Sequence, residues 1–312
     1  MREVRDAFKL DDTVVSALKG AELSGTTAAD RQKVWAKQDG RRKRYIAEYL
    51  IPRIVRPIKR GWPPITSETR GHGDLSPDEL AARSAALGPW TVRWPLAHGL
   101  TTMPDNDLTR GATDRLLYRR DLINGTVGAL LGEEIADTTM LDIGCNSGFF
   151  SIDMAGRGAK HVDGFDLRAQ NVAQAQFLAE HYGVPNVHFE VGDVDEFEPG
   201  RHWDVVLNLG VMYHMTDPFG LVRRTFELCR EFAIIDTVCH QEPIAAFLLR
   251  SDKNVNSSTE GREVIEFHPT YRGAIETIRS VGFSEVIEIV GTAKEPHDLY
   301  TRGVRRCFLA IK

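Results

Sequence analysis

The run Met140–Phe150 holds the residue types that most directly suggest chemistry. Its sequence, MLDIGCNSGFF, is typical of a short apolar strand that ends at Asp142, followed by a tight turn with Gly144, Asn146 and Gly148. Glycines in such a turn let the backbone approach a ligand at the carboxyl edge of a parallel sheet. The spacing is G-x-x-x-G, which differs from the G-x-G-x-x-G pattern that cradles a dinucleotide pyrophosphate. The turn therefore predicts a nucleoside ligand without phosphates, and S-adenosylmethionine (SAM) is the candidate cofactor.

Further candidate cofactor-binding residues close the next three predicted strands. Asp166 follows Gly148 by 18 residues, near the offset of about 20 residues at which an acid accepts ribose hydroxyls. Asp193 can accept a hydrogen bond from an adenine amino group while Val194 contacts the ring, and Asn208 closes the fourth strand. Any one acid here could instead cap a helix or a turn. Acids at three successive strand ends favour a cofactor cleft.

Tyr213 and His214 follow the fourth strand and are the candidate catalytic residues. Methyl transfer is an in-line displacement at carbon, for which a protein supplies alignment and, for a hydroxyl acceptor, a base. Histidine has an ordinary pKa of about 6.5, which suits a base near neutrality. We predict that His214 accepts the acceptor's proton and that Tyr213 positions the acceptor or the cofactor. The alternative is a structural His214 that caps a helix or bonds buried backbone.

From residue 112 onward, strand-like and helical patterns alternate, which is typical of a parallel sheet covered by helices on both faces. The predicted strands are 139–143, 161–165, 187–191, 203–209, 232–238, 285–290 and 305–311, and the predicted helices are 112–131, 148–158, 169–182, 218–230 and 270–281. The last two strands, with only a loop between them, should form an antiparallel hairpin. We expect an α/β fold with a doubly wound seven-stranded sheet, five strands parallel. Its domain would span 111–312, behind a mainly helical extension, 1–110, with helices over residues 1–56.

Two stretches, LDIGCNSGFFSIDMAGRGAKHVDGFD and NLGVMYHMTDPF, resemble the tRNA wobble-uridine carboxymethyltransferase-like group of class I SAM-dependent methyltransferases. VIEFHPTYRGAIETIRSVGF is similar to a helical segment of the same group, and the resemblance covers roughly residues 88–312. It implies the class I fold and a SAM-type cofactor. It leaves the acceptor open, because one such fold hosts many acceptors.

Family members that use carboxylated SAM hold its extra carboxylate with a lysine, a tyrosine and an arginine. By this resemblance Tyr213 corresponds to the tyrosine, and Arg302 or a neighbour in YTRGVRR to the arginine. The segment GPWTVRWPL before the core offers only Arg93 in place of the lysine. This departure favours ordinary SAM.

Residues beyond the fifth strand are candidates for binding the acceptor. Asp236 ends that strand, and His240 follows it. Residues 250–268 form a predicted polar loop that contains His268. Loops over the carboxyl edge of a sheet commonly carry acceptor specificity. We predict substrate-binding roles for Asp236, His240, His268 and Arg302.

Charge is unevenly distributed along the chain. Residues 31–60 hold eleven basic and two acidic side chains, a net charge of +9, so the remainder carries −14 of the total of −5. This segment could attract a phosphate-bearing partner, or it could be a solvated helix that contacts an acidic neighbour or a second subunit. The four cysteines are scattered without a C-x-x-C pair, which favours inert, reduced thiols in the cytoplasm and no metal site. No apolar run approaches the roughly 18 residues of a membrane span.

Three functions fit the sequence. The first is a SAM-dependent methyltransferase for a small acceptor, at the oxygen of a sugar or secondary metabolite, with residues 1–110 as acceptor pocket, lid or homo-oligomer contact. The second is a tRNA- or RNA-modifying (carboxy)methyltransferase that grips nucleic acid with the basic segment. The third is a SAM-binding scaffold without catalysis, which the Tyr213-His214 pair disfavours.

Overall fold

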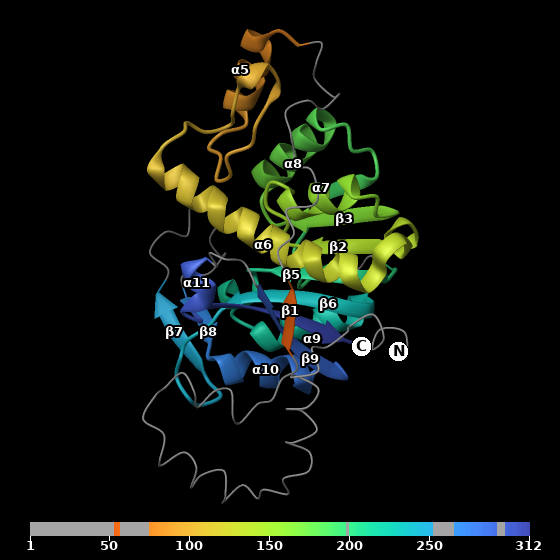
Figure 1. Cartoon of the computed structure of the whole chain (residues 1–312), viewed down its shortest axis with the longest axis vertical. Coiled ribbons are helices and arrows are strands. Elements are labelled where there is room, and N and C mark those ends of the chain that lie inside the picture. The colour runs from red at the N-terminus through yellow and green to blue at the C-terminus, as the bar shows by residue number, and fades with distance from the viewer. Residues whose placement is uncertain (1–52, 57–74, 198–199, 252–264, 292–296) are drawn as a thin grey trace, which may run out of the picture.

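The computed structural model describes residues 53–56, 75–197, 200–251, 265–291 and 297–312 (Figure 1). Apart from the strand β1 (Arg53–Arg56), the basic segment 31–60 therefore lies outside the described residues. The helices predicted before residue 53 lie outside them as well.

One mixed sheet of eight strands organises the described residues, in the order β1-β9-β10-β6-β5-β2-β3-β4. Its predicted members are β2 (Thr139–Ile143), β3 (His161–Asp166), β4 (Val187–Val191), β5 (Trp203–Leu209), β6 (Cys229–Val238), β9 (Glu285–Gly291) and β10 (Arg305–Ile311). The first five are parallel, and β10 is antiparallel to both β6 and β9. This confirms the predicted seven-stranded doubly wound fold.

The strand β1 adds an eighth member, parallel to β9 at the edge of the sheet. The helical prediction for residues 53–56 is therefore wrong. Ile54 and Val55 are β-branched, and β-branched residues favour strands.

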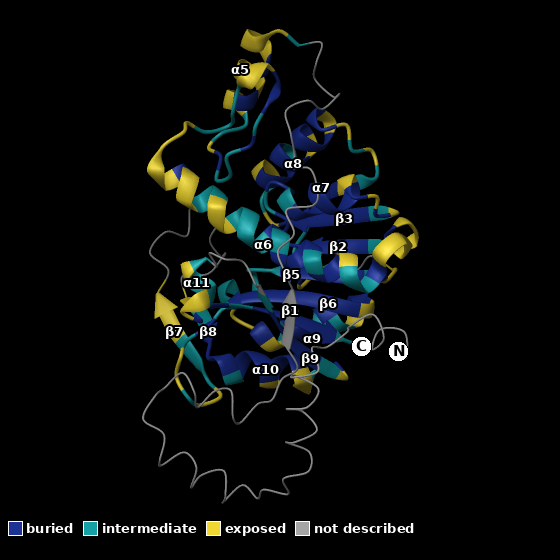
Figure 2. Ribbon diagram, viewed as in Figure 1, coloured by how far each residue is buried: buried dark blue, intermediate teal, exposed yellow. Residues whose placement is uncertain are grey.

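Helices cover both faces of the sheet, and the strands between them are largely buried (Figure 2). On one face lie α6 (Asp107–Leu131), α7 (Phe149–Gly156) and α8 (Ala169–His181), with α6 running across the sheet (Figure 1). On the other lie α9 (Pro218–Leu228) and α10 (Tyr271–Ser280). Separate apolar clusters fill the two interfaces, as expected for strands buried on both sides.

Two elements replace parts of predicted loops. The strands β7 (Phe247–Ser251) and β8 (Ile265–Pro269) form a separate antiparallel pair, so the predicted polar loop 250–268 is partly β-structure. A short helix, α11 (Asp298–Thr301), lies between β9 and β10. Both lie on the side of the molecule reached by the N-terminal half of α6 (Figure 1).

The segment before the core packs on the face that carries α8. Helix α5 (Pro77–Ala86) begins with a capping box between Ser76 and Glu79. Leu80, Trp90 and Trp94 then join an apolar cluster with α8. The expected domain boundary after residue 110 falls within α6. None of the described helices is long and apolar enough to cross a membrane.

Candidate active site

A cavity of about 720 Å³ lies at the carboxyl ends of β2, β3, β4 and β5. Its lining also includes side chains from α6, β8, β10 and the segment 91–93. The carboxyl edge is where doubly wound sheets bind ligands. The volume falls in the range of about 300–1,000 Å³ that is typical of small-molecule sites.

The turn after β2 brings main chain to the cavity, as the sequence predicts. Gly144, Asn146 and Gly148 all have positive φ, at 67°, 50° and 77°. A Cβ atom on Gly144 would lie 2.7 Å from Cγ2 of Val211, and one on Gly148 would lie 2.6 Å from Cζ of Phe189. Gly144 and Asn146 line the cavity, whereas Gly148 lets α7 begin tightly against its neighbours.

Asp142 and Asp166 lie together behind this turn. Asp142 is 2% exposed, and its Oδ2 accepts a hydrogen bond from Ser151 Oγ at 2.6 Å. Burial raises its pKa to about 7, which the hydrogen bond from Ser151 only partly offsets. Asp166 accepts bonds from the main-chain N–H of Asn146 at 2.9 Å and of Arg168 at 3.0 Å. It is 7% exposed, and burial raises its pKa too. Both acids line the cavity.

Asp193 and Val194 also line the cavity, after β4. Val194 is buried, and Asp193 is half-buried with Oδ1 accepting from the N–H of Asp195 at 3.1 Å. Asn208 does not line the cavity. It is fully buried, and its side-chain amide donates to Thr225 Oγ1 on α9 at 3.0 Å. Its amide thus joins β5 to α9 instead of reaching a ligand.

Tyr213 and His214 line the cavity after β5, in the short 3-10 helix Met212–His214. Their ring centroids lie 4.0 Å apart. His214 Nδ1 lies 2.6 Å from Oε1 of Glu266, which also lines the cavity. Oε2 of Glu266 bonds His268 Nε2 at 2.7 Å. His268 itself is buried behind Glu266 and does not line the cavity, so it contacts the site through that carboxylate.

Two arginines form another part of the cavity wall. Arg119 from α6 and Arg305 from β10 both reach the fully buried Asp236, at 3.0 and 2.6 Å. Tyr300 donates to the second oxygen of Asp236 at 2.6 Å. Burial opposes ionisation of Asp236, but the two arginines outweigh it and hold its pKa below the ordinary value. Both arginines line the cavity and Asp236 does not, so Asp236 orients cavity residues instead of meeting a ligand.

Two other predicted substrate-binding residues lie away from the cavity lining. Arg302 is exposed and pairs with Asp298 one turn earlier in α11. Arg305, the first residue of β10, lines the cavity, whereas Arg302 caps the end of α11. His240 lies at a bridge to Thr270, where its N–H donates to Pro269 O, and burial lowers its pKa.

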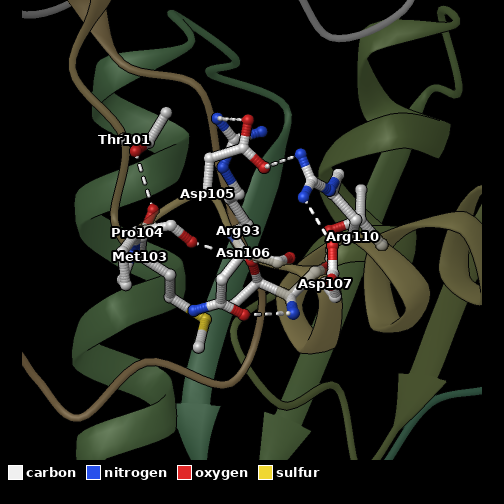
Figure 3. Close-up of polar contacts among 10 residues, drawn as sticks. Arg93, Thr101, Met103, Pro104, Asp105, Asn106, Asp107 and Arg110 are labelled. Atoms are coloured by element: carbon white, nitrogen blue, oxygen red, sulfur yellow. Dashed lines mark hydrogen bonds and ion pairs between the residues drawn. The ribbon is translucent and has the colours of Figure 1, made fainter.

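The segment before α6 closes one side of the cavity. Asp105 lies between Arg93 and Arg110, 3.7 Å from each (Figure 3). Asn106 caps α6 through a capping box with Thr109. Arg93, Met103 and Thr109 line the cavity. The ion pairs of Asp105 with Arg93 and Arg110 therefore hold one wall of the cavity in place. Thr91 donates to Asn146 Oδ1 at 3.3 Å and connects the wall to the glycine turn.

Sequence reasoning missed Arg115, Arg119 and Glu266. The arginines fall on the polar side of a predicted amphipathic helix, where charge usually indicates a solvated face. Glu266 lies in a stretch expected to be a loop. Its separation by one residue from His268 was the available signal, since residues i and i+2 of a strand share a face.

The residues present suit SAM. A side chain at position 144 would clash with Val211, so glycine leaves the main chain of the turn accessible to a ligand. Acidic residues lie at the ends of β3 and β4, where ribose and adenine would need hydrogen-bond acceptors. Comparison with known families decides the question: residues 135–277 match a family model described as a methyltransferase domain. This part of the chain, a little under half of it, is therefore similar to a methyltransferase domain. The S-adenosylmethionine predicted from the sequence agrees with this match.

Curated relatives of the methyltransferase domain fall into two groups. A tRNA U34 carboxymethyltransferase of Wolinella succinogenes is 26% identical over 164 residues, which cover 51% of this chain and 57% of the relative. Another, from Shewanella piezotolerans, is 36% identical over 110 residues, or 33% of each chain. A ubiquinone biosynthesis O-methyltransferase of Neisseria meningitidis is 33% identical over 100 residues, 31% of this chain and 42% of the relative. The chain thus spans less than two thirds of each relative.

Solved structures confirm the fold of the methyltransferase domain. The N-terminal domain of EvdMO1, crystallised with S-adenosylhomocysteine and D-fucose, superposes with a TM-score of 0.56 at 16% identity. The match covers 76% of this chain and 97% of that domain. Within the described ranges, no three His, Cys, Asp or Glu side chains converge as a metal site.

Proposed function

We propose that this protein is a SAM-dependent methyltransferase that methylates a hydroxyl oxygen of a small molecule, such as a sugar or a secondary metabolite. The observation that carries the proposal is the position of His214. It lines the same cavity as the glycine turn and the two strand-end acids. The cavity thus offers a cofactor half and, next to it, a group able to take a proton.

The proposed cofactor-binding residues are those that line the cavity after β2, β3 and β4. Main chain at Gly144 and Asn146 would meet the methionine part, with Asp142 balancing its ammonium group. Asp166 would accept from the ribose, and Asp193 with Val194 would hold the adenine. Gly148 acts indirectly by shaping the turn. When bound, SAM supplies a methyl group on a positively charged sulfur, which leaves as a neutral thioether.

His214 would act as the general base. As the acceptor oxygen forms its bond to the methyl carbon, the hydroxyl O–H breaks and its proton passes to the imidazole. Positioned bases of this kind contribute roughly 10²–10⁴-fold to a rate. Tyr213 packs against His214, and its ring lies 5.9 Å from the Arg305 guanidinium, so it would align the acceptor.

The character of the remaining lining supports a small acceptor. Leu108 and Met103 contribute apolar surface beside the threonines 91, 113 and 216. Leu108 is 87% exposed although it belongs to the cavity lining, so an apolar side chain faces the mouth. Such a mixture fits a molecule with an apolar frame and hydroxyl groups.

An RNA acceptor is the second candidate, because several relatives are named as tRNA U34 carboxymethyltransferases. Tyr213 and Arg305 lie near each other, as a clamp for carboxylated SAM would require. At the cavity wall, however, Arg93 pairs with Asp105, and among the residues that the structure describes no lysine lines the cavity. We therefore retain ordinary SAM and a small acceptor as the leading proposal.

The test begins with mass spectrometry of cofactor that co-purifies with the protein, followed by a SAM-consumption screen against sugars, phenols and bulk tRNA. We expect ordinary SAM or its demethylated product, and turnover with a hydroxylated small molecule. Carboxylated SAM, or turnover with tRNA that falls steeply with salt, would favour the second candidate. Turnover with any acceptor excludes a non-catalytic scaffold.

A matched pair of variants tests the base. His214→Ala should lose at least about 100-fold in kcat and keep its affinity for S-adenosylhomocysteine. His202→Ala is the control, because His202 is exposed at the amino end of β5, the strand that His214 follows. Full activity of His214→Ala would refute the role of the base.

A further inference from the structure

The β7–β8 hairpin places one carboxylate between two histidines at the edge of the cavity. Glu266 Oε1 lies 2.6 Å from His214 Nδ1, and Oε2 lies 2.7 Å from His268 Nε2. The side chains of these three residues are only 11–13% exposed. Both oxygens of Glu266 are therefore used by imidazoles in a site with little access to water.

The short contact indicates which nitrogen of neutral His214 carries the proton. A carboxylate oxygen 2.6 Å from Nδ1 repels a lone pair on that nitrogen, so the proton is favoured on Nδ1. With the proton on Nδ1, neutral His214 keeps the lone pair of Nε2. A base needs this lone pair, and the opposite tautomer would have none to offer the acceptor.

We propose that Glu266 is a positioning residue that holds His214 in the tautomer and orientation of a base, with His268 fixing Glu266 from its other side. This inference rests on the proposed function. When the acceptor O–H breaks, the proton moves to Nε2 of His214, and the resulting imidazolium lies against the ionised Glu266, which stays ionised. The carboxylate thus stabilises the charge that develops during transfer.

The other groups around His214 make this carboxylate necessary. Tyr213 packs against both His214 and His268, with ring centroids 4.0 and 5.4 Å away. The ring of His240 lies 5.7 Å from that of His268, and Arg305 lies 5.9 Å from the Tyr213 ring. These histidine and arginine neighbours disfavour an additional positive charge on His214. Glu266 is the acidic side chain that directly contacts both imidazoles.

The kinetic test is Glu266→Gln, which keeps the size of the side chain and removes its charge. We expect kcat to fall at least about tenfold, with the affinity for S-adenosylhomocysteine within about twofold of wild type. The acidic limb of the pH–rate profile should move to lower pH, because the imidazolium loses its carboxylate. Glu190→Gln, an exposed residue on β4, is the matched control. Unchanged kcat and an unchanged pH profile in Glu266→Gln would overturn the proposal.

A second measurement needs no turnover. Nitrogen-15 NMR of the intact protein, with His214 assigned from the His214→Gln spectrum, should show the Nδ1–H tautomer. A native Nε2–H tautomer would overturn the inference even if the enzyme is active. Conversely, an Nδ1–H signal in a protein that methylates no acceptor would contradict the proposed function and retain the positioning contact, so the two failures are distinguishable.

Discussion

The buried carboxyl of Asp142 makes cofactor binding and stability depend on pH in a way that one substitution should remove. Its pKa of about 7 lies roughly three units above its ordinary value of 3.8. At 1.36 kcal/mol per unit, this corresponds to about 4 kcal/mol between the two protonation states. The perturbation is Asp142→Asn, which resembles the protonated acid and can still accept from Ser151.

The sign for stability follows from proton binding. Between about pH 4 and 7 the folded state holds the proton of Asp142 and the unfolded state has lost it. The free energy of unfolding of wild type therefore falls as pH rises through this window. Asp142→Asn lacks this contribution. Above pH 7 it should be more stable than wild type by up to about 4 kcal/mol.

The sign for ligand binding is opposite. If the ammonium of S-adenosylhomocysteine lies near Asp142, the ionised carboxylate binds it and the neutral acid does not. With a pKa of about 7, ionisation rises from roughly a tenth at pH 6 to roughly nine tenths at pH 8. Wild-type affinity should therefore rise about tenfold over this range.

Calorimetric titration at pH 6 and 8, with urea denaturation at the same pH values, measures both effects. Asp142→Asn should bind weakly at both pH values. Asp137→Asn is the control, because Asp137 is exposed and does not line the cavity. A tenfold pH dependence that persists in Asp142→Asn would refute the assignment of the titrating group.

Three further predictions follow from the same contacts. Gly148→Ala should lose at least about 2 kcal/mol of unfolding free energy in urea denaturation, because a left-handed φ costs about 1–2 kcal/mol and the new Cβ meets Phe189; wild-type stability would contradict this. Asp236→Asn should lose about 3–5 kcal/mol, since Arg119 and Arg305 would be left without their carboxylate. Because those arginines lower the pKa of Asp236, its contribution to the free energy of unfolding is present above about pH 4 and is lost in stronger acid. The stability difference between wild type and Asp236→Asn should therefore become smaller in stronger acid. An equal stability difference at every pH would argue against this role of Asp236. All four cysteines are buried and burial raises the pKa of each thiol, to about 12 for Cys229 and Cys239, so a thiol reagent at pH 8 should label none of them before denaturation and four after it.

The sheet was predictable from sequence because its strands are short apolar runs separated by helices of ordinary length. The bounds of β2, β4, β5 and β10 agree with the predicted ranges. The hairpin β7–β8 was not predictable in the same way. Its burial pattern lacks clean alternation, and its strands belong to no larger sheet, so the sequence carries the polarity of a loop.

The residues of the candidate site were likewise predictable only in part. Residues that follow a predicted strand, such as Asp166 and His214, line the cavity because topology alone brings strand ends together. Asn208 is next to last in β5 and Asp236 lies two residues before the end of β6, and their side chains contact a helix and buried arginines. Strand pleating places alternate side chains on opposite faces, and a shift of one residue at the last position changes the outcome. Arg119 and Glu266 reach the cavity from elements whose placement depends on tertiary packing.

Equilibrium binding of S-adenosylhomocysteine to the full chain tests the central claim, that the cavity behind the glycine turn is a SAM site. Calorimetry should show one site per chain, with affinity at least tenfold lower in Asp166→Ala because the acceptor proposed for the ribose is lost. One hydrogen bond to a charged group is worth about 1.5–3 kcal/mol, and about 1.4 kcal/mol is tenfold in affinity, so a tenfold loss is the smallest change expected. No binding to the folded wild-type protein, or equal affinity in Asp166→Ala, would contradict the account.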